Sequence, residues 1–419
     1  MKNFSHCLAH DMFKHFSQTE VAKKTFLFDS CRCFCSGVLE LLFNNIALLI
    51  AIRVFHASKL EKSILTSAWF VGNFIAPMSQ IMATKTTRFT TMDFSRTYMF
   101  SISLLVFALA FVNSFSVFLP VLIAAIILFK QPAPLMADVY GQNYSPKERG
   151  SRLSLVLMIF PIPIVLFSRA CGRLLDMDLQ NYRLIVAVAA LAAIGSGIAF
   201  SKIPSRVLPQ HETKSVFSNF GIIFKDKVFA LMLLWWTFAG IANQMTKPLR
   251  AEYLVNPEYG LNTSNAVEAL ACMAIPCGFR LFSSMLWGKF FDRSKVIVTK
   301  VAINIFLTIG IWLFFYTKTR GVIYFAAALI GIAYGGGEVA LCLWVTRLAP
   351  KAKFSAYMSM NVAVVGLVGL LSPFIGYKLV NYLTFRQIGL CAAILTTISS
   401  IGFLSLLKHP RFADEKNHE

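Results

Sequence analysis

The sequence contains few charged residues. Asp, Glu, Lys and Arg together make up 14% of its 419 residues, whereas a soluble domain typically carries about a quarter. Hydrophobic residues make up 57% and the mean hydropathy is +0.64. Acidic residues are scarcer than basic ones, 20 against 40, which leaves a net charge of +20. This composition excludes an ordinary soluble protein and indicates a membrane protein.

Motifs typical of enzymes are also missing. The sequence has no His-Glu-x-x-His, no Gly-x-Ser-x-Gly and no glycine-rich phosphate loop with a lysine. We therefore expect no enzymatic activity, no cofactor and no ATP-driven pumping.

The nine cysteines form no disulfide framework. Cys31, Cys33 and Cys35 could suggest a bound metal. Residues two apart on a helix, however, point about 200° from each other, so three ligands at that spacing cannot converge. We expect no metal site.

What the sequence does contain is a duplicated pattern of long apolar segments. Ser145-Pro146-Lys147 leads into an apolar segment that ends at Gly172, and 204 residues further on Ala349-Pro350-Lys351 leads into a similar segment that ends at Gly376. A helix crosses the hydrocarbon core with about 20 apolar residues, and twelve segments fit. They are centred near residues 43, 73, 107, 128, 162, 192, 237, 277, 306, 332, 367 and 395.

These segments predict an all-α polytopic membrane protein with twelve transmembrane helices in two pseudo-symmetric six-helix halves. A duplicated bundle usually has its ligand site at the bilayer midplane. The predicted parts are a cytoplasmic N-terminal tail (1–25), an N-terminal half (26–202), a cytoplasmic linker (203–226), a C-terminal half (227–407) and a cytoplasmic C-terminal tail (408–419).

Lys and Arg concentrate in the two tails and in the loops on the same side of the predicted membrane. By the positive-inside rule, both termini are cytoplasmic. This asymmetry accounts for the net charge, so we expect contact with anionic lipid headgroups and no nucleic-acid partner. We expect a multi-pass protein of a bacterial inner membrane.

Two loops carry family motifs. One reads Gly288-Lys-Phe-Phe-Asp292-Arg293, and the other reads Glu148-Arg149-Gly150. With these motifs in a twelve-span duplicated chain, the sequence resembles the major facilitator superfamily of secondary transporters. The resemblance implies alternating access in a monomer, with helices 1, 4, 7 and 10 around the central cavity. It implies a gating role for Arg149, Gly288, Asp292 and Arg293; an ordinary solvated turn is the alternative for the Asp292 loop.

The first half departs from the family pattern. The position 204 residues before Asp292 is Arg88. Either Asp93 takes the place of Asp292 in a shifted loop, or this half lacks the charged contact that would hold one conformation. The predicted fifth helix reads Phe160-Pro161-Ile162-Pro163 instead of the glycine-rich pattern of family antiporters. This departure disfavours drug–proton antiport.

Four charged residues lie inside predicted spans: Glu40, Lys130, Arg280 and Glu338. Each costs roughly 3 kcal/mol or more at the bilayer centre, so such residues mark candidate functional sites. Contact with substrate or a proton and structural ion pairing are both open for them. We exclude Arg32, which can extend to the headgroups from its helix end.

Neutral polar residues extend the candidate site. Asn44 follows Glu40 by one helical turn, and Asn243 and Gln244 lie at matching positions in the second half. Such amides can instead join transmembrane helices by hydrogen bonds. Gly335-Gly336-Gly337, and Pro132 with Pro134 in the equivalent helix, predict bending or close helix contact near the cavity.

These observations predict a secondary active transporter of a small organic solute. The cations Lys130 and Arg280 favour an anionic solute, and Glu40 and Glu338 favour coupling to a proton. Sodium coupling and uniport remain open. The alternatives are a drug or metabolite efflux antiporter and a non-transporting membrane sensor or scaffold.

Overall fold

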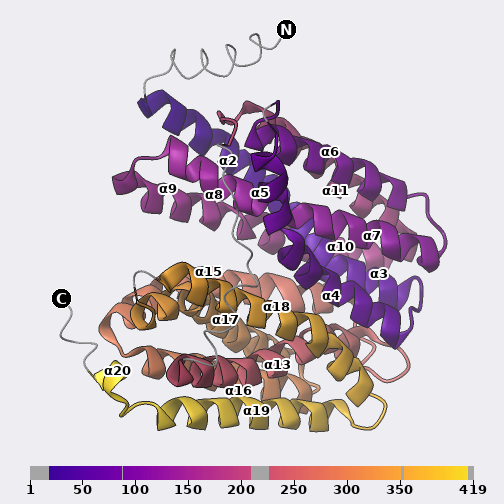
Figure 1. Cartoon of the computed structure of the whole chain (residues 1–419). Helices are drawn as coiled ribbons and strands as arrows, with labels where there is room; N and C mark the ends of the chain where they lie inside the picture. Colours follow the sequence, from indigo (N-terminus) through magenta and orange to yellow (C-terminus); the bar gives the residue numbers. More distant parts are fainter. Residues whose placement is uncertain (1–17, 87, 209–225, 351–352, 414–419) are drawn as a thin grey trace. The chain divides into compact units, whose positions relative to one another are not determined.

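The computed structural model describes the chain except for residues 1–17, 87, 209–225, 351–352 and 414–419. Every regular element in the described part is helical (Figure 1). The early elements are α2 (Gln18–Leu41), the π-helix η1 (Leu42–Ile46), α3 (Ala47–Arg53), α4 (Lys59–Ile75), α5 (Pro77–Thr84), α6 (Thr91–Leu109), α7 (Phe115–Lys130), α8 (Pro132–Asn143), α9 (Pro146–Ile159), α10 (Pro161–Met177), the short 3₁₀ helix η2 (Leu179–Asn181) and α11 (Tyr182–Lys202).

The later elements follow the same pattern. They are α13 (Lys227–Val255), α14 (Asn265–Ala269), the π-helix η4 (Leu270–Ala274), α15 (Ile275–Arg293), α16 (Val296–Tyr316), α17 (Arg320–Leu348), α18 (Phe354–Leu379), α19 (Phe385–Ser405) and α20 (Pro410–Ala413).

Eleven helical segments in the described residues are long and apolar enough to cross a membrane. The predicted all-α membrane fold is confirmed. The exception is the predicted span near residue 73, where α4 has only 17 residues and ends before Pro77. Proline has no N–H to donate to the preceding turn, so the helix is interrupted there.

Contacts between residues divide the chain into two compact units. The first comprises residues 1–56 and 68–213, and the second comprises residues 57–67 and 214–419. The short segment 57–67 thus packs with the second unit, although α4 continues into the first.

Prolines interrupt further helices of the first unit. α7 gives way to α8 at Pro132, and α9 gives way to α10 at Pro161. In the second unit, by contrast, α13 continues through Pro248 and α18 through Pro373. The predicted bend is therefore a helix break in the α7–α8 span, whereas α17 runs without a break through its three glycines.

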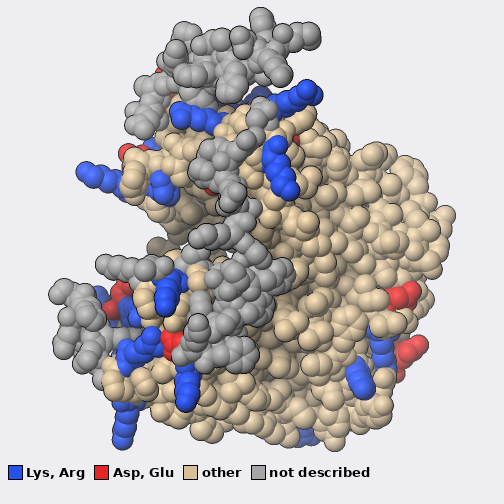
Figure 2. Space-filling view, viewed as in Figure 1, with Lys and Arg blue, Asp and Glu red and all other residues tan. Residues whose placement is uncertain are grey.

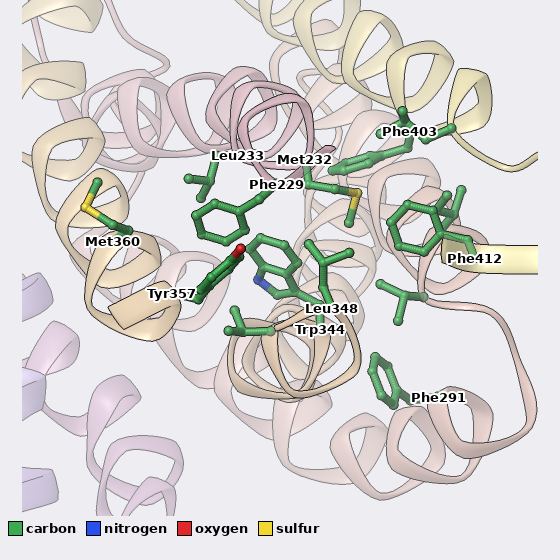
Figure 3. Packing of buried hydrophobic residues seen from close by; sticks show 14 residues of the cluster. Phe229, Met232, Leu233, Phe291, Trp344, Leu348, Tyr357, Met360, Phe403 and Phe412 are labelled. Atoms are coloured by element: carbon green, nitrogen blue, oxygen red, sulfur yellow. The ribbon is translucent and has the colours of Figure 1, made fainter. Parts of the chain in front are cut away.

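Aromatic residues fill the core at one end of the second unit (Figure 3). Phe229 stacks on Trp344 with ring centroids 5.4 Å apart and lies 4.6 Å from the Tyr357 ring. Asp226 caps the start of α13 by accepting from the Phe229 N–H. It also accepts two hydrogen bonds from Arg411 at 2.7 and 2.8 Å, which attach the short helix α20.

The outer surface fits a lipid environment. On the face shown in Figure 2, charged side chains lie near helix ends, and uncharged residues cover the helix middles. Large apolar side chains are exposed along these helices, including Leu104, Phe282 and Ile401. In water such a surface would favour aggregation, whereas a bilayer accommodates it.

Candidate functional site

A pocket of about 290 Å³ lies within the second unit, among α13, α15, α16, α17 and α18. Four residues predicted from the sequence line it: Asn243, Gln244, Arg280 and Glu338. Its other polar lining residues are Thr237, Lys247, Asn304 and Tyr334. The structure thus brings the four second-half candidates together at one concave site, which is the usual form of a small-molecule site.

The two predicted charges of this half form an ion pair. Arg280 donates from Nη1 to Glu338 Oε1 at 3.0 Å. The Arg280 side chain is 20% exposed and that of Glu338 is 58% exposed. The pair is therefore partly accessible to solvent, unlike a fully buried pair.

Glycines set the distance between the helices that carry this pair. A Cβ on Gly335 of α17 would lie 2.8 Å from the Arg280 carbonyl oxygen of α15 and 3.0 Å from the Ser284 nitrogen. A Cβ on Gly336 would lie 2.6 Å from Ile303 Cγ1 of α16. A Cβ on Gly337 would meet no atom within 4 Å, and this glycine lines the pocket. The first two glycines are thus needed for close packing.

A hydrogen-bond chain orients another part of the wall. Tyr334 donates to Asn243 Oδ1 at 3.0 Å, and Arg250 donates to the Tyr334 hydroxyl at 2.6 Å. Arg250 is 3% exposed. The sequence analysis did not select Arg250. The feature that could have identified it is a basic residue close to the apolar part of α13.

The first-half candidates lie in the first unit and not in this pocket. The Lys130 ammonium lies 2.9 Å from the ring centroid of Trp69 and 5.6 Å from that of Phe129. Glu40 and Asn44 are half-buried on α2 and η1. Because η1 begins at Leu42, a wider π-helical turn lies between them, so the α-helical spacing assumed from the sequence does not hold.

The prediction that Arg32 extends to the headgroups is wrong. Arg32 donates from Nε to Asp29 Oδ1 at 2.6 Å, and its side chain is 14% exposed. Tyr140 donates to the other Asp29 oxygen at 2.8 Å. Asp29 is completely buried, and a carboxylate there requires such partners. In the sequence, the feature that could have indicated this ion pair is the three-residue spacing of Asp29 and Arg32, which places both side chains on one face of a helix.

A second buried carboxylate, Glu252, also escaped the sequence analysis. Lys62 pairs with its Oε1 at 2.6 Å, and Tyr377 donates to the same oxygen at 3.2 Å. Asn256 and Tyr259 donate to Oε2 at 2.7 and 2.8 Å. Glu252 therefore has four polar partners within the second unit.

The predicted gating residues have few contacts within their own units. Asp292 and Arg293 are exposed, and a Cβ on Gly288 would meet no described atom of its unit within 4 Å. Arg347 instead holds the end of α15, donating to the Phe291 and Ser294 carbonyl oxygens at 2.8 and 3.0 Å.

The corresponding residues of the first unit have local structural contacts. Arg149 donates to the carbonyl oxygen of Gly141 at 3.0 Å. Arg88 is exposed. Asp93 forms the capping box of α6 with Thr90, so its carboxylate is used at the start of its own helix. A gating role for Arg149, Gly288, Asp292 and Arg293 stays a prediction.

Comparisons with known proteins agree with this architecture. A family model described as Major Facilitator Superfamily matches residues 32–352. A mutant of the nucleoside transporter NupG is similar with a TM-score of 0.77 and 11% identity, over 92% of this chain and 100% of that one. A bacterial homolog of the human lysosomal transporter Spinster has a TM-score of 0.68 and 14% identity, over 95% and 98%.

A D-xylose–proton symporter has a TM-score of 0.69 and 13% identity, over 91% of this chain and 96% of its own. At these identities the structural likeness shows the fold alone. No curated protein is significantly similar in sequence. The family model covers most of the chain, and the two loop motifs pointed to the same family. The chain belongs to the Major Facilitator Superfamily of membrane transporters.

Proposed function

We propose that this protein is a secondary active transporter that carries a small organic anion together with a proton by alternating access. The single observation that supports this best is the Arg280–Glu338 pair on the pocket wall. An anionic group of the solute and the Glu338 carboxylate are competing partners for the Arg280 guanidinium.

Proton coupling follows from that competition. When Glu338 takes up a proton it loses its negative charge, and its attraction to Arg280 weakens. Arg280 then binds the anionic group of the solute, for which a guanidinium is well suited. The proton and the solute therefore bind together. The amides Asn243 and Gln244 provide donors and acceptors for the neutral part of the solute.

The first unit has its own candidates for the cycle. Lys130 lies at the break between α7 and α8, where a cation–π contact with Trp69 stabilises its charge. We propose that Lys130 and Glu40 are solute or proton contacts of the first unit. We further propose a monomer in a bacterial inner membrane with both termini in the cytoplasm.

An uptake screen in proteoliposomes tests the function. The purified full-length chain is reconstituted, a pH gradient is imposed, and uptake of labelled organic acids, sugars, nucleosides and amino acids is measured against protein-free liposomes. Accumulation of an organic acid that collapses with the gradient supports the proposal. Gradient-independent uptake contradicts proton coupling. The absence of uptake across all solute classes favours a non-transporting sensor or scaffold.

A further inference from the structure

Lys300 is a buried cation that the proposed exchange between Arg280 and Glu338 does not use. It lies on α16, is 1% exposed, and its ammonium makes no hydrogen bond with any described residue. The described residues also contain no carboxylate in ion-pair distance of it. A buried charge is costly without partners, so the position requires an explanation.

Two indoles surround the ammonium. Its Nζ lies 3.1 Å from the ring centroid of Trp236 and 5.1 Å from that of Trp344. Cation–π attraction offsets part of the cost of burial. It leaves the N–H donors of Lys300 without acceptors, however, and the buried indole N–H of Trp344 also has no acceptor. Two unsatisfied donors therefore occur in the same part of the unit.

This cluster adjoins the pocket. Trp236 lines the pocket wall, whereas Lys300, in contact with the Trp236 ring, does not line it. Ile303 and Asn304, one helical turn after Lys300 on α16, also line the pocket. Lys300 therefore lies behind a wall residue, and rotation of the half-buried Trp236 side chain is the local change that would connect it to the pocket.

We propose that Lys300 and the Trp344 N–H form an oxyanion subsite behind Trp236, which takes a carboxylate or phosphate group of the solute. An oxyanion would supply the acceptor that both donors lack and the negative charge that the ammonium lacks. This inference rests on the proposed function and narrows it. The solute then carries two anionic groups, one for Arg280 and one for Lys300.

Binding of inorganic phosphate to the detergent-purified full-length protein tests the subsite. Tryptophan fluorescence is followed during titration, with chloride at matched ionic strength as the salt control. We expect saturable binding that Lys300→Gln weakens about 10- to 100-fold, the range for a hydrogen bond to a charged group. Lys300→Arg should restore binding because it retains the charge. Lys318→Gln, in the exposed loop after α16, is the matched control and should leave binding unchanged.

The fluorescence response also locates the site. Trp236→Phe should diminish it, because the ammonium rests on this indole. No saturable phosphate binding, equal binding by the native protein and Lys300→Gln, or an undiminished response in Trp236→Phe would each overturn the proposal. Binding that is lost in Arg280→Gln but kept in Lys300→Gln would assign the anion to Arg280 and also overturn it.

The test separates the subsite from the transport function. Proton-driven uptake without Lys300-dependent anion binding rejects the subsite and leaves the proposed function intact. Lys300-dependent binding without uptake of any solute rejects transport and retains the subsite. An acetate titration in parallel distinguishes a carboxylate-selective from a phosphate-selective site.

Discussion

Replacement of Gly335 by Ala should separate α17 from α15 and destabilise the second unit. The new Cβ would lie 2.8 Å from the Arg280 carbonyl oxygen and 3.0 Å from the Ser284 nitrogen, in addition to a closer approach to the Ser283 hydroxyl. Two of these atoms belong to the backbone, so a side-chain rotation cannot relieve the contact. The helices must move apart instead.

The size of the effect follows from two opposing terms. Overpacking costs about 1 to 3 kcal/mol, and backbone contacts place this site in the upper part of that range, at about 2 to 3 kcal/mol. The gain in helix propensity from Gly to Ala is about 1 kcal/mol. The free energy of unfolding should therefore fall by about 1 to 2 kcal/mol in Gly335→Ala.

Gly337→Ala is the matched control two residues away. Its Cβ would meet no atom within 4 Å, so only the propensity gain applies and stability should be unchanged or rise by up to about 1 kcal/mol. The two variants should then differ by about 1 to 3 kcal/mol. Reversible unfolding of the purified protein in mixed detergent measures this difference. Equal stability of the two variants would refute the packing role of Gly335.

Two further predictions concern ion pairs of the second unit. Burial raises the pKa of Asp226, but hydrogen bonds from Arg411 and Tyr357 outweigh this effect and hold the pKa below its ordinary value. The attachment of α20 should therefore persist down to about pH 4, the pKa of Asp in the unfolded chain. It should weaken as the pH falls further. Amide hydrogen exchange of α20 as a function of pH measures this attachment. In Asp226→Asn the amides of α20 should be unprotected at every pH. Protection equal to that of the native protein would contradict the role of the carboxylate. Lys62→Met should lower the free energy of unfolding by about 3 to 5 kcal/mol, because it leaves Glu252 buried without its cation. The double variant Lys62→Met with Glu252→Gln should recover part of this loss in the same unfolding assay. An unchanged free energy of unfolding in Lys62→Met would show that Glu252 does not require the ion pair.

Much of the fold follows from the sequence because the bilayer imposes long apolar helices. Arg280 and Glu338 could be selected because charges are rare in such helices. That they pair could not be predicted, since the contact depends on how closely Gly335 and Gly336 let α17 approach its neighbours. The break of α4 before Pro77 shows a similar limit, because composition predicted one continuous span there.

Two of the missed residues lie near helix ends. Lys62 and Lys300 each occupy positions where a charge ordinarily reaches water or headgroups. Lys300 is the fifth residue of α16, and from the sequence it resembles a helix-end cation. Its burial arises from Trp236 and Trp344, which come from two other helices. Such burial depends on tertiary packing and has no local sequence signal.

The measurement that most directly tests the proposed mechanism is transport by Glu338→Gln in proteoliposomes with the organic anion found in the uptake screen. The amide has nearly the same shape as the carboxylate but takes up no proton, and it competes weakly for Arg280. Solute exchange across the membrane should therefore continue, whereas accumulation driven by an imposed pH gradient should be lost. Accumulation by Glu338→Gln at the native level, with the same dependence on the pH gradient, would contradict the exchange of partners at Arg280.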